Sequence, residues 1–252
     1  MDKDYLVPPE AFLLSQGVGG GDFKKIGDGL TDRFRKRQWI DRDSIVLDIG
    51  CGLGRIARPL TDFLWPPGAY YGFDINKSSI DWCNNHYAEF DNFHFQWIDL
   101  QSTYYSPDGR VASSDFTFPL SDGTVDFVNL TSVFTHMLLS DVRHYLFEIS
   151  RMLKPGGHTY ITYFLVDKTI DKSLEDGAAE GRWSPVDGGY IKDPICPEKV
   201  VLLKEDTVRH LYDAAGLQIT DLSYGRWAQG LHSSRQSRQH GGYQDEIVAF
   251  KP

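Results

Sequence analysis

The chain has 252 residues, a formal net charge of −9 and a sequence pI of about 5.3. With 41% hydrophobic and 24% charged residues, it has the composition of an ordinary soluble globular protein. The acidic balance argues against a nucleic-acid partner, which generally requires clustered Lys and Arg. The local basic run of Arg33, Arg35, Lys36 and Arg37 is interpreted as a solvated helix face.

Cysteine usage and the N-terminus indicate where the protein works. Cys51, Cys83 and Cys196 form no short pairing motif, which is typical of a reducing compartment. The first residues lack the basic and apolar regions of a signal peptide. No apolar run approaches the ~20 residues of a membrane span. We therefore expect a cytoplasmic protein with no membrane partner.

Residues 1–38 are predicted to form an N-terminal helical cover. A first helical piece is followed by a glycine-rich stretch, 17–23, and then by a helix that ends at about Trp39. The glycine run is either a plain linker or a hinge that closes over a ligand. Residues 39–252 are predicted to form one domain, since the chain has no internal repeat and no long low-complexity segment.

The segment Ile45–Arg55 is the most informative part of the sequence. Its apolar start predicts a buried strand of a parallel sheet over 45–49. Gly50, Gly52 and Gly54 follow at alternate positions, where they permit a sharp turn and a close approach of the backbone to a ligand. A helix begins next, so its N-terminal N–H groups face the polar atoms of that ligand.

A second apolar run, Tyr70–Ile75, contains Asp74, which lies 24 positions after Gly50. In a nucleotide-binding βαβ unit, an acid about 20 residues after the glycines accepts hydrogen bonds from ribose hydroxyls. Asp74 is therefore predicted to bind a ribose, and the two motifs together predict an adenosine-type site.

The dinucleotide fingerprint G-x-G-x-x-G/A fits this loop poorly. Arg55 occupies its last position, where a small residue allows the helix to pack closely on the strand. A pyrophosphate also needs no acid beside it, whereas Asp48 would suit a ligand with an ammonium group. Asp48 either holds such a group, through water or loop amides, or fixes the loop by accepting backbone N–H bonds.

A series of five segments, in this order, resembles the class I S-adenosylmethionine-dependent methyltransferases. D-I-G-C-G-L-G-R (48–55) is followed by G-F-D-I (72–75), and the segments 118–128, 148–157 and 211–217 resemble elements around the last strands of that family. The resemblance covers 40–165 well and the C-terminal part more loosely. It implies an α/β, Rossmann-like, doubly wound, mostly parallel seven-stranded sheet with helices on both faces and an N-terminal helical lid.

Further strands are predicted over 70–74, 93–98, 125–130, 158–165 and 246–250. Long connections follow the third and fifth strands, at 101–117 and 167–200, and we expect both to shape an acceptor pocket because ligands bind beyond the carboxyl ends of such strands. The tail 227–243 is expected to form a loop before the last strand.

The resemblance also implies a set of cofactor-binding residues. Asp74 would bind the ribose, Ile75 would pack on the adenine, and Asp99, with Asp115 as its competitor, would accept a hydrogen bond from the adenine amino group. Arg55 would reach the loop carbonyls or the cofactor carboxylate, or lie on the helix surface. Cys51 is interpreted as a small residue tolerated in a tight loop. The complete set is Asp48, Gly50, Cys51, Gly52, Gly54, Arg55, Asp74, Ile75, Asp99, Leu100, Leu130 and Ser132.

His136 is the predicted general base, because a histidine can take a hydroxyl proton near neutral pH. The alternative is that it caps or packs at the start of the following helix. No metal is expected. Some O-methyltransferases that the chain resembles bind magnesium through acids around the fourth strand, but here Asp126 begins that strand instead of ending it. No zinc-ligand spacing is present either.

The sequence thus predicts a methyltransferase that uses S-adenosylmethionine, leaves S-adenosylhomocysteine as the product, and methylates a small-molecule or saccharide acceptor in biosynthesis, at oxygen in preference to nitrogen. The alternatives are an N-methyltransferase, an NAD-dependent enzyme of similar fold and a non-catalytic cofactor-binding scaffold. The acceptor itself and the oligomeric state are left open.

Overall fold

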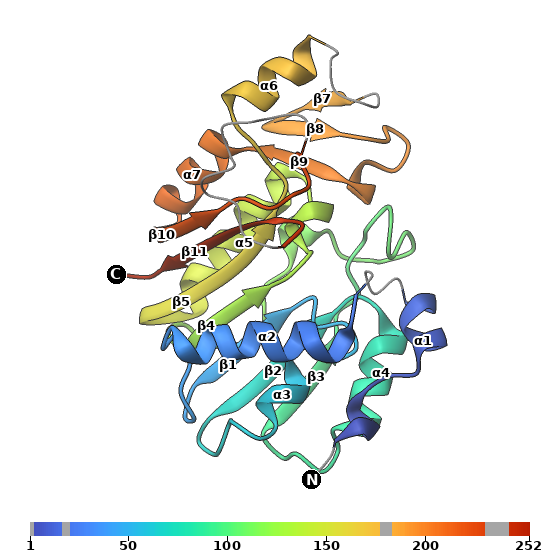
Figure 1. The fold of residues 1–252 in the computed structure, drawn as a ribbon, viewed down its shortest axis with the longest axis vertical. Helices are drawn as coiled ribbons and strands as arrows, with labels where there is room; N and C mark the ends of the chain where they lie inside the picture. The colour runs from blue at the N-terminus through green and yellow to red at the C-terminus, as the bar shows by residue number, and fades with distance from the viewer. Residues whose placement is uncertain (1–2, 17–20, 177–182, 230–241) are drawn as a thin grey trace. The chain divides into compact units, whose positions relative to one another are not determined.

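The computed structural model describes residues 3–16, 21–176, 183–229 and 242–252. A seven-stranded sheet has the order β10-β11-β5-β4-β1-β2-β3 (Figure 1). Parallel pairs join β1 to β2, β1 to β4 and β2 to β3, whereas β11 runs antiparallel to β5 and β10. This arrangement confirms the predicted Rossmann-like sheet. Its strands are β1 (Ile45–Ile49), β2 (Ala69–Asp74), β3 (Phe93–Trp97), β4 (Val125–Leu130), β5 (Leu153–Tyr163), β10 (Gln218–Ser223) and β11 (Asp245–Phe250).

The strand β5 begins five residues earlier than the sequence predicted. Gly156 donates a backbone hydrogen bond to Lys251, at 2.7 Å, and Lys251 donates one to Gly157, at 3.0 Å. These bonds continue the β5–β11 ladder past His158. Gly156 and Gly157, which end the segment 148–157, therefore lie within β5, where Gly156 has a positive φ of 81°.

The chain divides into two compact units, of which the first contains residues up to Asp99 together with Thr124–Asn129. Around β1–β4 it holds η1 (Asp4–Leu6), α1 (Glu10–Ser15), α2 (Phe23–Lys36), α3 (Ala57–Leu60) and α4 (Lys77–His86). Helix α2 starts at Asp22, whose carboxylate accepts a hydrogen bond from the N–H of Lys25. Its buried Phe34 packs on Phe127 of β4, with ring centroids 4.7 Å apart. This helix is thus anchored on the sheet.

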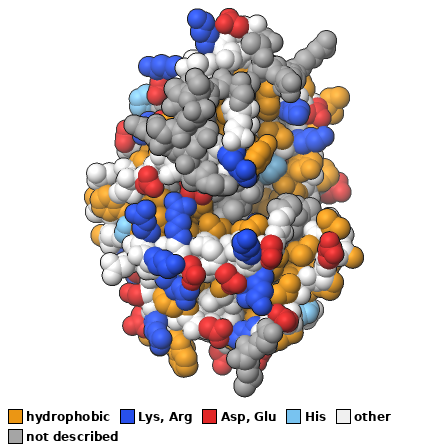
Figure 2. All heavy atoms as spheres, viewed as in Figure 1, with side chains coloured by type: hydrophobic (Ala, Val, Ile, Leu, Met, Phe, Trp, Pro, Cys, Tyr) orange, Lys and Arg blue, Asp and Glu red, His pale blue; other side chains and the backbone are white. Residues whose placement is uncertain are grey.

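The basic end of α2 is exposed at Arg35, Lys36 and Arg37. Arg35 pairs with Asp32 and lies over the ring of Phe63. Basic and acidic side chains are interspersed over the face that carries α2 (Figure 2). These contacts agree with the interpretation of the run as a solvated helix face.

The second unit contains Leu100–Gly123 and Leu130–Pro252. The predicted insertion at 167–200 contributes two strands, β7 and β8, to a small sheet of order β6-β9-β8-β7, whose strands β6 and β9 flank the insertion. The helices and further strands are η2 (Ser113–Asp115), η3 (Phe134–His136), α5 (Leu139–Met152), β6 (Leu165–Val166), α6 (Lys168–Glu175), β7 (Ser184–Val186), β8 (Gly189–Ile191), η4 (Pro197–Lys199), β9 (Val201–Lys204) and α7 (Glu205–Ala214).

The small sheet has an apolar cluster of its own, in which Val166, Ile170, Tyr190 and Leu202 are buried. This cluster explains why the insertion is folded although its composition is that of a loop. Part of the predicted glycine-rich stretch, 17–20, and most of the tail loop, 230–241, lie outside the described residues. The predicted division at residue 38 stays a prediction. No helix in the described parts of the chain is long and apolar enough to cross a membrane.

Candidate functional site

The glycine loop closes onto the neighbouring strand immediately after β1. The N–H groups of Gly50 and Cys51 both donate to the carbonyl oxygen of Phe73 in β2, at 2.7 and 3.1 Å. Gly50, Gly52 and Gly54 all have positive φ angles, of 75°, 52° and 79°. Because side chains disfavour this left-handed region, the alternating glycines are what allow the turn.

Gly54 and Gly52 are needed for different structural reasons. A Cβ on Gly54 would lie 2.7 Å from the hydroxyl of Tyr87, so this glycine is required by packing within the protein. A Cβ on Gly52 would meet no atom within 4 Å. The space beside Gly52 is therefore open, and a ligand can approach the backbone there.

Asp74 ends β2 at the edge of this space. Its Oδ2 accepts a hydrogen bond from the N–H of Gly52, and its Oδ1 accepts one from the N–H of Asn76, both at 2.7 Å. Burial raises the pKa of the carboxyl group, and these N–H donors oppose that shift. Since each carboxylate oxygen can accept two hydrogen bonds, Asp74 keeps capacity for a further donor.

Asp48 is buried beneath the loop and is held by side chains, although the sequence had suggested backbone N–H donors as one alternative. It accepts hydrogen bonds from the hydroxyl of Tyr70, at 2.5 Å, and from the amide of Asn129, at 2.6 Å. Burial raises its pKa to about 6, against the opposing effect of these two bonds and of the positive charge of Arg55. Asp48 therefore keeps its proton to a higher pH than an ordinary carboxyl group does.

Arg55 follows the last glycine, and its side chain is largely withdrawn from solvent. Burial lowers its pKa, whereas the charge of Asp48 raises it. The guanidinium makes no hydrogen bond or ion pair with another residue in the described parts of the chain. A desolvated guanidinium of this kind favours an anionic partner, such as a ligand carboxylate.

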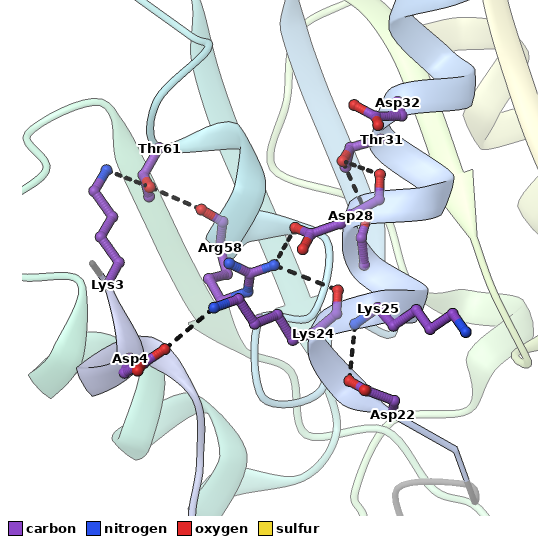
Figure 3. Close-up of polar contacts among 12 residues, drawn as sticks. Lys3, Asp4, Asp22, Lys24, Lys25, Asp28, Thr31, Asp32, Arg58 and Thr61 are labelled. Atoms are coloured by element: carbon purple, nitrogen blue, oxygen red, sulfur yellow. Dashed lines mark hydrogen bonds and ion pairs between the residues drawn. The ribbon is translucent and has the colours of Figure 1, made fainter. Parts of the chain in front are cut away.

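Helix α2 lies directly against the loop. A Cβ on Gly27 would stand 2.2 Å from the carbonyl oxygen of Arg55, so the two backbones touch. Arg58 of α3 forms an ion pair with Asp28 and donates to the carbonyl of Lys24 (Figure 3). These contacts fix α2 against one side of the glycine loop.

The first residues of the chain are tied to the same region. Lys3 donates to the hydroxyl of Thr61, at 2.7 Å, while Lys24 pairs with Asp4 (Figure 3). Lys3 also pairs with Asp62. Ion pairs thus join η1 to α2, α2 to α3, and Lys3 to the residues that follow α3. Whether part of the N-terminal cover opens as a lid stays a prediction.

The remaining predicted cofactor residues of the first unit lie close to these elements in the chain. Ile75 follows β2, and its carbonyl accepts a hydrogen bond from the indole of Trp97, at 2.9 Å. Asp99 is half-buried. Burial raises the pKa of Cys51, so its thiol is neutral, as suits a small residue in a tight loop.

The second unit holds the other predicted residues, and its Leu100 and Leu130 are buried. Asp115, the competitor of Asp99, lies in η2. Ser132 has a φ of 64°, unusual for a residue with a side chain. Its N–H donates to the hydroxyl of Thr162, at 2.7 Å, and its own hydroxyl donates to Gln244, at 3.0 Å. These bonds hold the strained backbone at this position.

His136 ends η3, where three residues that sequence reasoning missed surround it. Its Nδ1 lies 3.1 Å from the carbonyl oxygen of Glu198, and its Nε2 lies 3.4 Å from the hydroxyl of Tyr105. Tyr104 stacks on the imidazole, with centroids 5.8 Å apart. Burial lowers the pKa of His136, although Glu198 opposes this shift. The imidazole is therefore neutral at physiological pH.

Within the described ranges, no group of three or more His, Cys, Asp or Glu side chains is placed to hold a metal ion.

The chain belongs to the methyltransferase domain family, whose model matches residues 22–222. The predicted resemblance to class I S-adenosylmethionine-dependent methyltransferases is confirmed, and S-adenosylmethionine is the cofactor of this class. This finding argues against the NAD-dependent alternative. The PH0226 protein from Pyrococcus horikoshii OT3 has the same fold, with a TM-score of 0.61, 15% identity and 100% coverage of both chains.

Three curated relatives differ in their acceptors. The sterol 24-C-methyltransferase erg6 of Schizosaccharomyces pombe is 30% identical over 139 residues, which cover 55% of this chain and 32% of that protein. The O-methyltransferase cnsE of Penicillium expansum is 22% identical, with 79% and 60% covered. The tRNA N(3)-cytidine methyltransferase METTL2 of Gallus gallus is 27% identical, with 44% and 28% covered. The chain thus spans less than two thirds of each of these relatives.

Proposed function

We propose that this protein is an S-adenosylmethionine-dependent methyltransferase that methylates a small-molecule or saccharide acceptor at an oxygen atom. The observation that carries the proposal is the open space beside Gly52, with the carboxylate of Asp74 at its edge. Carboxylate acceptors at the end of the second strand suit the hydroxyl groups of a ribose.

The chemistry of the loop also fits the amino-acid part of this cofactor. Arg55 offers a desolvated guanidinium to a carboxylate, and Asp48 offers a buried carboxylate to an ammonium group. The sulfonium of S-adenosylmethionine supplies an activated methyl group with a good leaving group already in place. The protein therefore mainly has to orient the acceptor and exclude water.

His136 supports oxygen as the methylated atom. A hydroxyl must lose its proton as it takes the methyl carbon, and the Nε2 of a neutral imidazole can accept that proton. A neutral amine can attack without such a base. Tyr104 and Tyr105, which are 44% and 46% exposed, add flat surfaces on which a sugar or aromatic ring can pack beside the imidazole.

Calorimetry tests the cofactor site. We expect the protein to bind S-adenosylmethionine and S-adenosylhomocysteine, and Asp74→Ala to weaken both by at least ~100-fold, because two charge-assisted hydrogen bonds contribute roughly 3 kcal/mol or more. Asp81→Ala, which removes an exposed carboxylate on α4, is the control. Binding that survives Asp74→Ala unchanged would overturn the assignment of Asp74 as the ribose ligand.

A screen for S-adenosylhomocysteine release then tests turnover. Small alcohols, phenols, saccharides and amines serve as acceptors, with tRNA included because one relative acts on it. Release with hydroxyl compounds alone is the expected result. Release with amines or tRNA alone would replace the proposed acceptor, and cofactor binding without release with any acceptor would favour the scaffold alternative.

A further inference from the structure

We propose that Glu198 is a positioning residue for His136: it selects the tautomer that can act as a base and holds the Tyr104–Tyr105 turn beside the imidazole. The inference rests on the proposed base role of His136. It concerns two segments, 101–117 and 167–200, whose chemistry the sequence did not reveal.

The main-chain carbonyl of Glu198 sets the tautomer. It lies 3.1 Å from the Nδ1 of His136, and a carbonyl oxygen can only accept a hydrogen bond. In the neutral ring, Nδ1 must therefore carry the proton, and the lone pair stays on Nε2. The atom that is left to accept a proton is thus Nε2, on the side of the ring that faces Tyr105.

The side chain of Glu198 forms hydrogen bonds with the segment 101–117. Its Oε2 accepts hydrogen bonds from the hydroxyl of Ser102, at 2.5 Å, and from the N–H of Thr103, at 2.8 Å. The Ser102 oxygen in turn lies 3.4 and 3.3 Å from the N–H groups of Tyr104 and Tyr105. One carboxylate oxygen therefore fixes the turn that carries both tyrosines.

That turn defines the surroundings of Nε2. Tyr104 is nearly parallel to the imidazole, at 11°, whereas Tyr105 stands edge-on at 83° with its ring centroid 5.2 Å away. The distance of 3.4 Å between the Tyr105 hydroxyl and Nε2 is long for an O–H donor. An acceptor hydroxyl can therefore replace Tyr105 at Nε2 at little cost.

Because only Oε2 of Glu198 accepts the two hydrogen bonds, the anchoring role of this side chain can be tested separately from its charge. Since both donors reach Oε2, the one carbonyl oxygen of a glutamine can accept both bonds. Glu198→Gln thus keeps the anchor and removes the charge, whereas Glu198→Ala removes both. Loss of the anchor frees η4 and the 102–105 turn from each other, apart from the weaker contact of the Cys196 thiol with the carbonyl of Thr103, at 3.5 Å.

The tautomer can be read without knowing the acceptor. We would label the histidines with 15N and record long-range 1H–15N correlations of the cofactor-free protein at a pH where His136 is neutral. The His136 signals are assigned by their loss in His136→Asn. We expect a single Nδ1–H tautomer in the wild type and in Glu198→Gln. Glu198→Ala keeps the main-chain carbonyl but loses the side-chain anchor that fixes η4 against the 102–105 turn, so the carbonyl is no longer held opposite Nδ1 and we expect a mixture of both tautomers.

Glu205→Ala is the matched control, because the carboxylate of Glu205 also accepts hydrogen bonds, from Tyr224 and Arg209, but no contact joins it to His136 in the described parts of the chain. A wild-type spectrum with the Nε2–H tautomer would overturn the proposal, as would an unchanged tautomer in Glu198→Ala. A tautomer mixture in Glu205→Ala would reduce the effect to general loosening of the unit.

Failure of the proposed function is distinguishable from failure of this inference. Binding of S-adenosylmethionine is measured on the same samples and is expected to be equal in the wild type and both Glu198 variants. Absence of binding in the wild type would remove the proposed cofactor site but leave the tautomer result readable. Once an acceptor is found, Glu198→Gln is expected to restore kcat to within about threefold of the wild type and Glu198→Ala to lower it more than tenfold.

Discussion

The glycine loop and the His136 cluster are built in opposite ways. The loop draws its residues from the ends of paired strands and the turns after them, so the register of the sheet brings Gly52 and Asp74, 22 positions apart, together. The cluster joins η3 to two insertions, and its central contact links residues 62 positions apart. The first is fixed by backbone conformation and by strand pairing, while the second depends on a few hydrogen bonds between segments that are not paired in the main sheet. A binding site of the first kind resists change, whereas one of the second kind can be altered by exchanging an insertion.

Removing the imidazole should have the largest effect. With any acceptor that supports turnover through a hydroxyl, His136→Asn is expected to lower kcat by roughly 10²–10⁴-fold, the usual contribution of a general base. The asparagine amide can still donate to the carbonyl of Glu198, so the cluster should stay folded. Steady-state kinetics and calorimetry give the two readouts.

An unchanged kcat in His136→Asn would show that the cluster does not take part in proton transfer. Equal loss of cofactor binding and turnover would indicate instead that His136 supports the fold. Either result would contradict the assignment of cofactor binding to the glycine loop and proton transfer to the His136 cluster.

The buried acid beneath the loop should control how stability depends on pH. The pKa of Asp48 in the fold, about 6, lies above its ordinary value of 3.8, so between these pH values the folded chain binds a proton that the unfolded chain has lost. Wild-type stability should therefore fall, relative to Asp48→Asn, as the pH rises from about 4 to about 6, by roughly 3 kcal/mol. Urea unfolding of both proteins across this range measures the difference.

Above pH 6 the difference should be constant, because both states of the wild type are then ionised. A rise in wild-type stability relative to Asp48→Asn as the pH increases through the same window would mean that Asp48 is stabilised as a charged group. That outcome would assign the dominant effect to Tyr70, Asn129 and Arg55 instead of burial.

Adding one methyl group at Gly52 should show whether this glycine is needed for cofactor binding as well as for the positive φ of the loop. Gly52→Ala places a Cβ in the open space and is expected to weaken binding of S-adenosylmethionine by about tenfold or more, with a loss of stability of about 1 kcal/mol from the positive φ. Gly216→Ala is the matched control, since Gly216 has a φ of 71° and equally open space away from the loop. Calorimetry and thermal unfolding report on both variants.

The two alanine variants should thus lose similar stability and differ in affinity. Equal affinity would mean that the ligand does not approach Gly52, which would move the cofactor away from the open side of the loop.

The smallest effect is expected from the ion pairs of α2, the helix that packs against the glycine loop. Asp28→Asn leaves the buried guanidinium of Arg58 without its charged partner and should cost about 1–2 kcal/mol of stability. Asp32→Asn, which breaks the exposed pair with Arg35 on the same helix, should cost less than about 0.5 kcal/mol. A larger cost for Asp32→Asn in urea unfolding would contradict the anchoring role of the Asp28–Arg58 pair.

Sequence reasoning succeeded where chain spacing determines geometry. Three glycines at alternate positions and an acid 24 residues after the first of them place Gly52 and Asp74 together, because parallel strands end at the same edge of a sheet. The partners of Asp48 follow from strand register, since Asp48 stands opposite Asn129 on β4, but this register is not readable in one strand alone. Glu198 could not be found, since nothing local to an insertion specifies which distant side chain it will contact.

The contact between Gly27 and Arg55 has a consequence for the evolution of this helix. Gly27 tolerates no side chain, whereas a Cβ on Gly29, two residues further along α2, would meet nothing within 4 Å. Selection for folding should therefore keep position 27 invariant and leave position 29 free to drift. Two identical residues on one helix, indistinguishable in the sequence, are thus under opposite mutational constraints.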